Sequence, residues 1–152
     1  MATTDQTLLK VQRLLTGPME LSIQLHGELI TVSFRDSSTP IHIRVQEGGK
    51  YRDGSPRTMV TVSSPLLRGV TPKPELYEHI VRKIPRLWFG SVAVWDDTAT
   101  PGTVMLALGH TLLGEFLDEE ELRAVVFGVL GCANELDDLL QKEFGGKRWT
   151  DS

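Results

Sequence analysis

Cysteine is nearly absent from this sequence, since its 152 residues contain only Cys132. A single cysteine forms no disulfide within the chain and supplies no cluster of thiolates for a metal. Cys132 also lies in an apolar stretch without a neighbouring histidine or basic residue, a setting that raises the pKa of a thiol and disfavours a nucleophile. We therefore expect no function based on cysteine chemistry.

Long apolar runs and concentrated positive charge are also missing. No run approaches the roughly 18 apolar residues that span a bilayer, and the region around Asp5 lacks the basic and apolar parts of a signal peptide. The formal net charge is −4, whereas phosphate binding requires a concentrated basic surface. The sequence thus predicts a cytoplasmic protein with no membrane partner and no nucleic-acid partner.

Residues with the spacing of a catalytic or metal site are missing as well. The four histidines lack the short spacings that place two imidazoles on one metal: His26, His42, His79 and His110. Asp96 and Asp97 are adjacent in a turn and point apart, so loop chemistry explains them better than an acid–base pair. His42 and Arg44 share the outer face of one strand and could bind a carboxylate, although a solvated strand face is the simpler interpretation. We expect no enzyme, no catalytic residue, no metal and no cofactor.

The composition is that of one folded domain. The hydrophobic fraction of 40% and the charged fraction of 24% are ordinary for a globular protein. A chain of this length buries roughly two thirds of its unfolded surface, which makes a core without metal or disulfide support. We predict a single domain over residues 1–152, with an ordered core over about residues 5–146 and a frayed tail at residues 150–152.

Hydrophobic periodicity predicts the order helix, four strands, helix, two strands, helix. Apolar residues recur every three to four positions in the helices and every two in the strands, with Pro65 ending the first group of strands. The predicted helices cover residues 3–17, 72–85 and 118–146, and the predicted strands cover residues 19–25, 30–34, 41–46, 58–63, 87–95 and 103–113. The last two strands are apolar on both alternations, which is typical of strands covered on both faces. The order predicts an α+β fold with an antiparallel sheet of five to six strands and helices packed on it.

The last helix is the longest periodic segment. Asp118, with Glu121 at the third helical position, fits its N-cap, and Gly145-Gly146 stops it. One apolar stripe follows three- and four-residue spacing and predicts the face that packs on the core. The stripe consists of Leu122, Val125, Val126, Val129, Ala133, Leu136 and Leu140.

The opposite side of this helix is also unsuited to water. It carries Ala124, Phe127, Gly128 and Gly131, within a stretch that holds no charge from residue 124 to residue 133. Each interior glycine costs a helix about 1 kcal/mol relative to alanine, which suggests that another element approaches closely. A loop, another element or a second copy of the chain can provide that cover. We favour the second copy and predict a homodimer in which the partner chain lies against Gly128.

Tryptophans mark a second candidate binding surface. On the predicted strand at residues 87–95, Trp88 and Val92 fall on one side, and Phe89 and Trp95 fall on the other. Aromatic side chains on both sides of a strand usually belong to the core, and the alternative is that one side forms a binding surface. We regard Trp88 and Trp95 as candidate binding or dimer contacts.

The order of elements and several local stretches resemble the YbjN-type family and the related type III secretion chaperone fold of the CesT kind. The resembling stretches are the loop at residues 95–97, the strand at 103–113 running into the acidic cap at 117–122, and the ending at residues 133–138 and 144–146. The resemblance implies a small cytoplasmic domain, often dimeric, that binds peptide segments of other proteins. One departure concerns the sheet, because six strands and a long hairpin at residues 48–57 differ from the five strands of a secretion chaperone.

The resemblance implies a non-enzymatic chaperone or adaptor with a peptide or protein client. Two alternatives remain open at this point. One is a dimeric regulatory or structural domain without a peptide client, and the other is a sensor of a small ligand.

Overall fold

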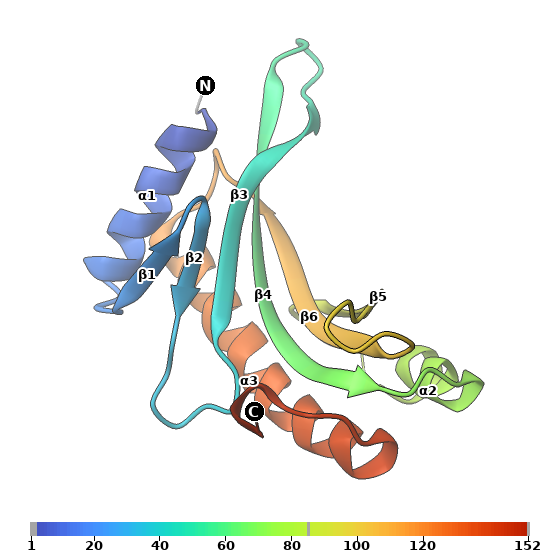
Figure 1. Ribbon diagram of the computed structural model, residues 1–152. Coiled ribbons are helices and arrows are strands. Elements are labelled where there is room, and N and C mark those ends of the chain that lie inside the picture. The colour runs from blue at the N-terminus through green and yellow to red at the C-terminus, as the bar shows by residue number, and fades with distance from the viewer. Residues whose placement is uncertain (1–2, 85, 152) are drawn as a thin grey trace.

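The computed structural model describes residues 3–84 and 86–151 (Figure 1). Its elements follow the predicted order, and the α+β prediction is confirmed. Pro85, which we expected to end the second helix, lies outside the described residues. The elements are α1 (Thr4–Thr16), β1 (Ile23–His26), β2 (Leu29–Val32), β3 (Ile41–Lys50), β4 (Pro56–Val70), α2 (Pro74–Glu78) with the π-helical turn η1 (His79–Lys83), β5 (Ser91–Asp96), β6 (Val104–Leu113), α3 (Glu119–Phe144) and the 3-10 turn η2 (Trp149–Asp151).

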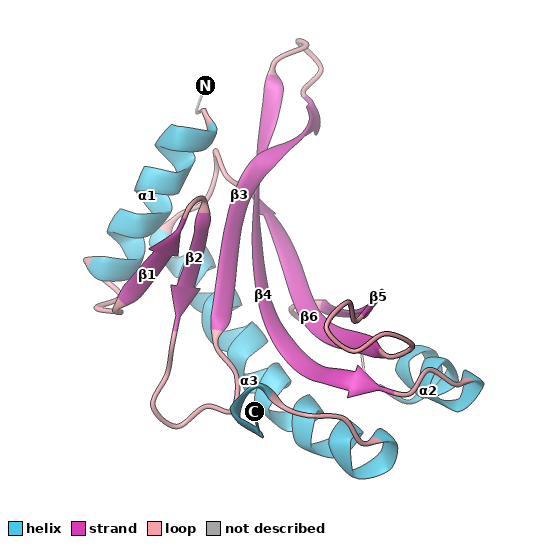
Figure 2. Ribbon diagram, in the orientation of Figure 1, coloured by secondary structure: helices cyan, strands magenta, loops and turns pink. Residues whose placement is uncertain are grey.

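The strands form one antiparallel sheet in the order β1-β2-β3-β4-β6-β5. The hairpin that joins β3 to β4 extends beyond the rest of the sheet, and β4 curves strongly toward α2 at its other end (Figures 1 and 2). The sheet has short strands at its edges, and its three longest strands, β3, β4 and β6, lie next to one another between them.

Both long helices cover the same face of this sheet. The predicted stripe of α3 is buried in full, and Val11 and Leu15 of α1 are completely buried beside it. They pack against strand residues on one alternation, namely Ile30, Val32, Ile41, Ile43, Val45, Val60 and Val62, each at most 2% exposed. The residues between them point to the opposite side of the sheet. That side is called the open face below.

Both long helices are capped, and the caps of α3 are the predicted ones. Thr3 accepts a hydrogen bond from the Gln6 amide, and the Gln6 side chain accepts one from the Thr3 amide. Asp118 accepts a hydrogen bond from the Glu121 amide at 2.8 Å. Gly145 ends α3 with φ +74°, a left-handed backbone conformation that glycine adopts without strain.

The prediction for the strand at residues 19–25 is partly wrong, because β1 begins only at Ile23. The amides of Met19 and Leu21 donate instead to the carbonyls of Leu14 and Leu15, so this stretch continues the end of α1. Leu25, expected on the buried side, is 49% exposed. The short β1 forms an edge of the sheet, so its side chains are less covered than those of the central strands.

Pro65 does not end the first group of strands, since β4 passes through it and reaches Val70. The register with β6 shifts between Pro65 and Leu67. A proline lacks the amide donor that a regular ladder requires, and such a break in register accommodates it.

The predicted strand at residues 87–95, covered on both faces, is also wrong. β5 begins at Ser91 and forms an edge of the sheet. Residues 87–90 leave the sheet, and Phe89 packs between α3 and β6, where its ring lies 5.6 Å from the His110 ring. The apolar content of this stretch thus reflects a loop that packs on α3.

Candidate functional site

The open face consists of side chains aligned across neighbouring strands. One row is His26, Leu29, Arg44, Thr61 and Thr111, in register from β1 to β6. The row beside it is Gln24, Thr31, His42, Ser63, Gly109 and Ser91, which reaches β5. His42 and Arg44 therefore share the outer face, as the sequence predicts.

This face is hollowed. A recess of about 420 Å³ has polar and basic residues of β3 on one side and Trp95 of β5 on the other. Its floor is built from small side chains: Thr61, Ser63, Ala93, Ala107, Gly109 and Thr111. The hydroxyl oxygens of Thr61 and Thr111 lie 3.1 Å apart, so both strands present hydrogen-bonding groups to the recess. A ligand backbone can approach closely because no large side chain stands on the floor.

The charge on the open face is of one sign. Arg44, His42 and His26 lie on it, whereas no aspartate or glutamate of the described strands shares this alternation. Burial lowers the pKa of His42, and the nearby Arg44 and His26 lower it further. The lowered pKa keeps His42 largely neutral at pH 7 and leaves Arg44 as the fixed positive charge of this face.

Trp149 lies beside His42 near the start of β3. Its ring meets the His42 ring edge-on, with 5.7 Å between centroids. The segment carrying it pairs with β4, because the Arg68 and Lys147 backbones exchange two hydrogen bonds of 2.9 Å. Sequence reasoning missed this segment and its contact with His42, since the cap at Gly145-Gly146 indicates only the end of a helix.

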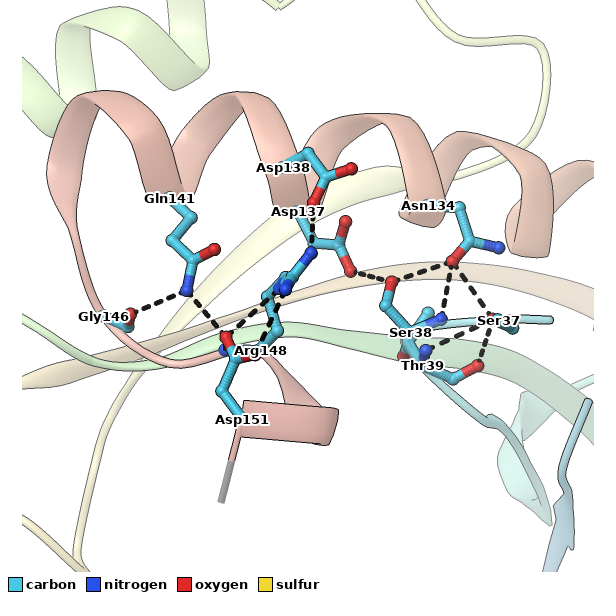
Figure 3. A network of polar contacts seen from close by, with 10 residues as sticks. All are labelled: Ser37, Ser38, Thr39, Asn134, Asp137, Asp138, Gln141, Gly146, Arg148 and Asp151. Atoms are coloured by element: carbon cyan, nitrogen blue, oxygen red, sulfur yellow. Dashed lines mark hydrogen bonds and ion pairs between the residues drawn. The ribbon is translucent and has the colours of Figure 1, made fainter. Parts of the chain in front are cut away.

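Arg148 fastens this C-terminal segment to α3. It bonds to Asp138 of the helix and to Asp151 of η2, and Gln141 also donates to Asp151 (Figure 3). These bonds lower the pKa of the Asp151 carboxyl and raise that of the Arg148 guanidinium. The prediction of a frayed tail is wrong for Thr150 and Asp151, while Ser152 lies outside the described residues.

A second polar cluster lies where the loop at residues 36–40 meets α3. Asp137 is fully buried and contacts the Ser38 hydroxyl, which also lies 2.9 Å from Asn134 Oδ1 (Figure 3). Asn134 Oδ1 accepts hydrogen bonds from the Ser37 hydroxyl and the Ser38 amide as well. Burial raises the pKa of Asp137. The cluster ties a loop to the helix, and the apolar stripe gives no sign of it.

The residues predicted on the second side of α3 are largely exposed. Ala124 and Gly131 are open to solvent, and Phe127 is 42% exposed with one edge against Phe34 at 5.9 Å. Gly128 differs, because a β-carbon built there would lie 2.5 Å from Phe89 Cδ2. The close neighbour predicted for Gly128 exists, but it belongs to the same chain.

The two candidate tryptophans lie on different surfaces. Trp95 is 53% exposed and lines the recess on the open face. Trp88 is 93% exposed and immediately precedes Phe89, the residue that packs on Gly128 of α3. Of the six predicted contact residues, Trp95 lies on the open face, four lie on α3, and Trp88 precedes the residue that packs on α3.

We also searched the described residues for a metal site and for a membrane-spanning helix. Between residues 3 and 84 and between 86 and 151, no group of three or more His, Cys, Asp or Glu is arranged to hold a metal ion. The helices of that same part of the chain are too short or too polar to cross a membrane. Asp97 supports the loop after β5, where its carboxylate accepts from the amides of Gly69 and Ala99.

Comparison with known families places these features in context. Residues 10–152 match the model of the family described as TY-Chap1, "T3SS (YopN, CesT) and YbjN peptide-binding chaperone 1". A search of curated proteins found no match. The family match covers nearly the whole chain, including every strand that contributes to the open face.

Proposed function

This chain belongs to the family of type III secretion (YopN, CesT) and YbjN peptide-binding chaperones, and we propose that it binds extended peptide segments of a client protein on the open face, without catalysing a reaction. The observation that carries the proposal is the recess itself. Two helices cover one face of the sheet, and the other face is hollowed and lined with small and hydroxyl-bearing residues.

The floor of the recess suits a peptide backbone. Ser and Thr hydroxyls both donate and accept hydrogen bonds, so they satisfy the amides and carbonyls of a bound segment. Five gaps of ~4.8 Å between six strands make the face about 24 Å wide, which an extended segment of about seven residues crosses. Leu29 and Trp95 near opposite edges provide apolar surface for its side chains.

Filling the recess tests this proposal. Gly109→Phe introduces a large side chain on the floor, and the first added carbon meets only ordinary contacts, 3.7 Å from Ser63 Cβ. We expect phage-displayed ten-residue peptides to be enriched on the wild-type protein and not on Gly109→Phe. Arg13→Phe, at an exposed position of α1, serves as the control and should enrich the same peptides. Equal binding of the enriched peptides to Gly109→Phe would show that they bind elsewhere.

We also propose that the chain forms a homodimer through the surface around α3. Trp88 is exposed next to Phe89, which packs on α3, and Ala124 and Gly131 are exposed small residues of that helix. A two-fold axis brings the protruding side chain of each copy onto the small residues of the other. A tryptophan exposed to this degree is also a strong candidate for the centre of an interface.

The dimer is tested by the mass of the purified protein at micromolar concentration. Light scattering should give twice the chain mass of 16.9 kDa. Trp88→Ser should shift the equilibrium toward the single chain, whereas Trp95→Ser, at the tryptophan of the open face, should not. A single-chain mass for the wild-type protein would contradict this part of the proposal, and the protein would then present both surfaces as a monomer.

A further inference from the structure

Arg44 lines the recess, and its positive charge has no ion-pair partner among the described residues. Arg123 pairs with Glu119 at 2.8 Å, and Arg148 pairs with two aspartates. Among the described residues, no ion pair or hydrogen bond joins the Arg44 guanidinium to another side chain. It projects from the middle of a strand into the recess, in a protein whose net charge is −4.

The neighbours of Arg44 are suited, like Arg44 itself, to binding a carboxylate. Thr61 lies directly opposite Arg44 in the register of β3 and β4, and its hydroxyl can donate a hydrogen bond. His42 is on the same face of β3, two residues away, and His26 lies in the same row beyond Leu29. A guanidinium binds both oxygens of a carboxylate, and such charge-assisted hydrogen bonds are the strongest available to a side chain.

The apolar residues of the recess indicate where this carboxylate lies in the ligand. Leu29 lies next to Arg44 on the β2 side, and Trp95 lies across the recess on β5. Small side chains, including Ser63, Gly109 and Ala107, occupy the floor between Arg44 and Trp95. Apolar surface on both sides of the basic group fits a peptide that continues past the carboxylate in both directions. The acid is therefore an internal aspartate or glutamate rather than a chain terminus.

We propose that the client segment is an extended acidic peptide, whose central Asp or Glu binds Arg44 and Thr61 while apolar residues on either side pack on Leu29 and Trp95. This inference rests on the proposed peptide-binding function and specifies the chemistry of the peptide. The open face selects for a negative side chain by charge complementarity, since its described strands present the charge of Arg44 and no aspartate or glutamate.

Three peptide libraries test the selection for an acid. Each library consists of ten-residue peptides with an acetylated N-terminus and an amidated C-terminus. The fifth position is Glu in one library, Gln in the second and Lys in the third, and the other nine positions are randomised. We expect fluorescence anisotropy on the enriched peptides to show at least tenfold tighter binding for the Glu peptides than for the same peptides carrying Gln. Arg44→Gln should abolish that ratio, and Arg13→Gln, which removes an exposed arginine from α1, should preserve it.

The outcomes separate this inference from the proposed function. Peptides that bind the wild-type protein, fail to bind Gly109→Phe and show no preference for Glu over Gln would leave the peptide site standing and overturn the acid recognition. A Glu preference that survives in Arg44→Gln would also overturn it, because another group would then bind the carboxylate. Absence of any peptide that depends on Gly109 would instead remove the proposed function.

Discussion

Phe89 fills the space above Gly128, and this single contact decides what a substitution there does. Alanine favours a helix over glycine by about 1 kcal/mol, whereas overpacking costs about 1–3 kcal/mol. Because Phe89 also lies against His110, it has little room to move away. We expect Gly128→Ala to lower the free energy of unfolding by about 1 kcal/mol, measured by urea denaturation.

Gly131 provides the matched control for that prediction. A β-carbon built at Gly131 meets nothing within 4 Å, so only the gain in helix propensity remains. Gly131→Ala should raise the free energy of unfolding by up to about 1 kcal/mol. Combining Gly128→Ala with Phe89→Leu should remove part of the penalty. If Gly128→Ala stabilised the protein as much as Gly131→Ala does, Phe89 would not be packed where the structure places it.

Asp137 makes the stability of the protein depend on pH in an unusual direction. The Ser38 hydroxyl has one hydrogen and two neighbouring acceptors, Asn134 Oδ1 and Asp137 Oδ2. One hydrogen cannot serve both acceptors. If Asp137 is protonated, it donates to the Ser38 hydroxyl, and that hydroxyl donates to Asn134 Oδ1, so every group has a partner. Burial raises the Asp137 pKa in agreement with this arrangement. A carboxyl whose pKa is raised by folding stabilises the folded state at low pH, and this contribution is lost as the pH rises through the folded-state pKa.

Asp137→Asn should therefore increase the stability at pH 7, because an amide retains a donor for Ser38 and carries no charge. The difference in melting temperature between the variant and the wild-type protein should shrink as the pH falls below the folded-state pKa of Asp137. Comparing the two proteins at each pH cancels the effect of the other carboxyl groups. A variant that is less stable at pH 7 would show that the ionised carboxylate is the form that holds the loop.

Asp137 and Gly128 also show what the sequence can and cannot predict for single residues. Three- and four-residue spacing predicted every apolar residue of the buried stripe, because helical geometry alone determines that face. The spacing gave no sign of Asp137, which borders the stripe beside Leu136 and is buried by a loop almost a hundred residues away. For Gly128 the spacing predicted a close neighbour correctly but assigned it to the wrong chain.

Among the elements, the C-terminal segment depends most on a few bonds. It is fastened through Arg148 and pairs with β4 at Arg68. Arg148→Ala should release it and expose the Arg68 amide, whose hydrogen-exchange rate should rise at least tenfold. Arg123→Ala, which removes an ion pair near the other end of α3, should leave that rate unchanged. Unchanged protection in both variants would show that pairing with β4 holds the segment without Arg148.

The elements that the sequence predicted incorrectly share a physical cause. β4 continues through Pro65 because a shift in register accommodates a missing amide, and β5 begins four residues late because Phe89 packs on α3. Both depend on contacts between segments far apart in the chain. Alternation along one strand, in contrast, is local, and it placed His42 and Arg44 on the outer face correctly.

For the molecule as a whole, the arrangement of layers explains why one surface remains available. Three helices and six strands provide enough apolar surface to cover one face of the sheet, and α1 and α3 share that task. Alternating polar residues on β2, β3 and β4 make the other face compatible with water, so the domain folds without covering it. The sequence predicts which side chains face the helices and which face water. Which of the outer side chains meet in the recess depends instead on the register between strands, and hairpin geometry and bulges determine that register.

The two proposed surfaces lie on different layers of the molecule, and their functions should therefore separate. Arg44 is on the open face, whereas Trp88 adjoins the segment that packs on α3. Substitutions more than about 7–10 Å apart without shared partners have additive effects, within ~0.3–0.5 kcal/mol. Arg44→Gln should weaken binding of the Glu peptides without changing the dimer, and Trp88→Ser should do the reverse. Combining the two should reproduce both effects in sedimentation and anisotropy measurements. If Trp88→Ser also weakened peptide binding, the second copy would contribute to the recess, and the functional unit would be the dimer rather than the single chain.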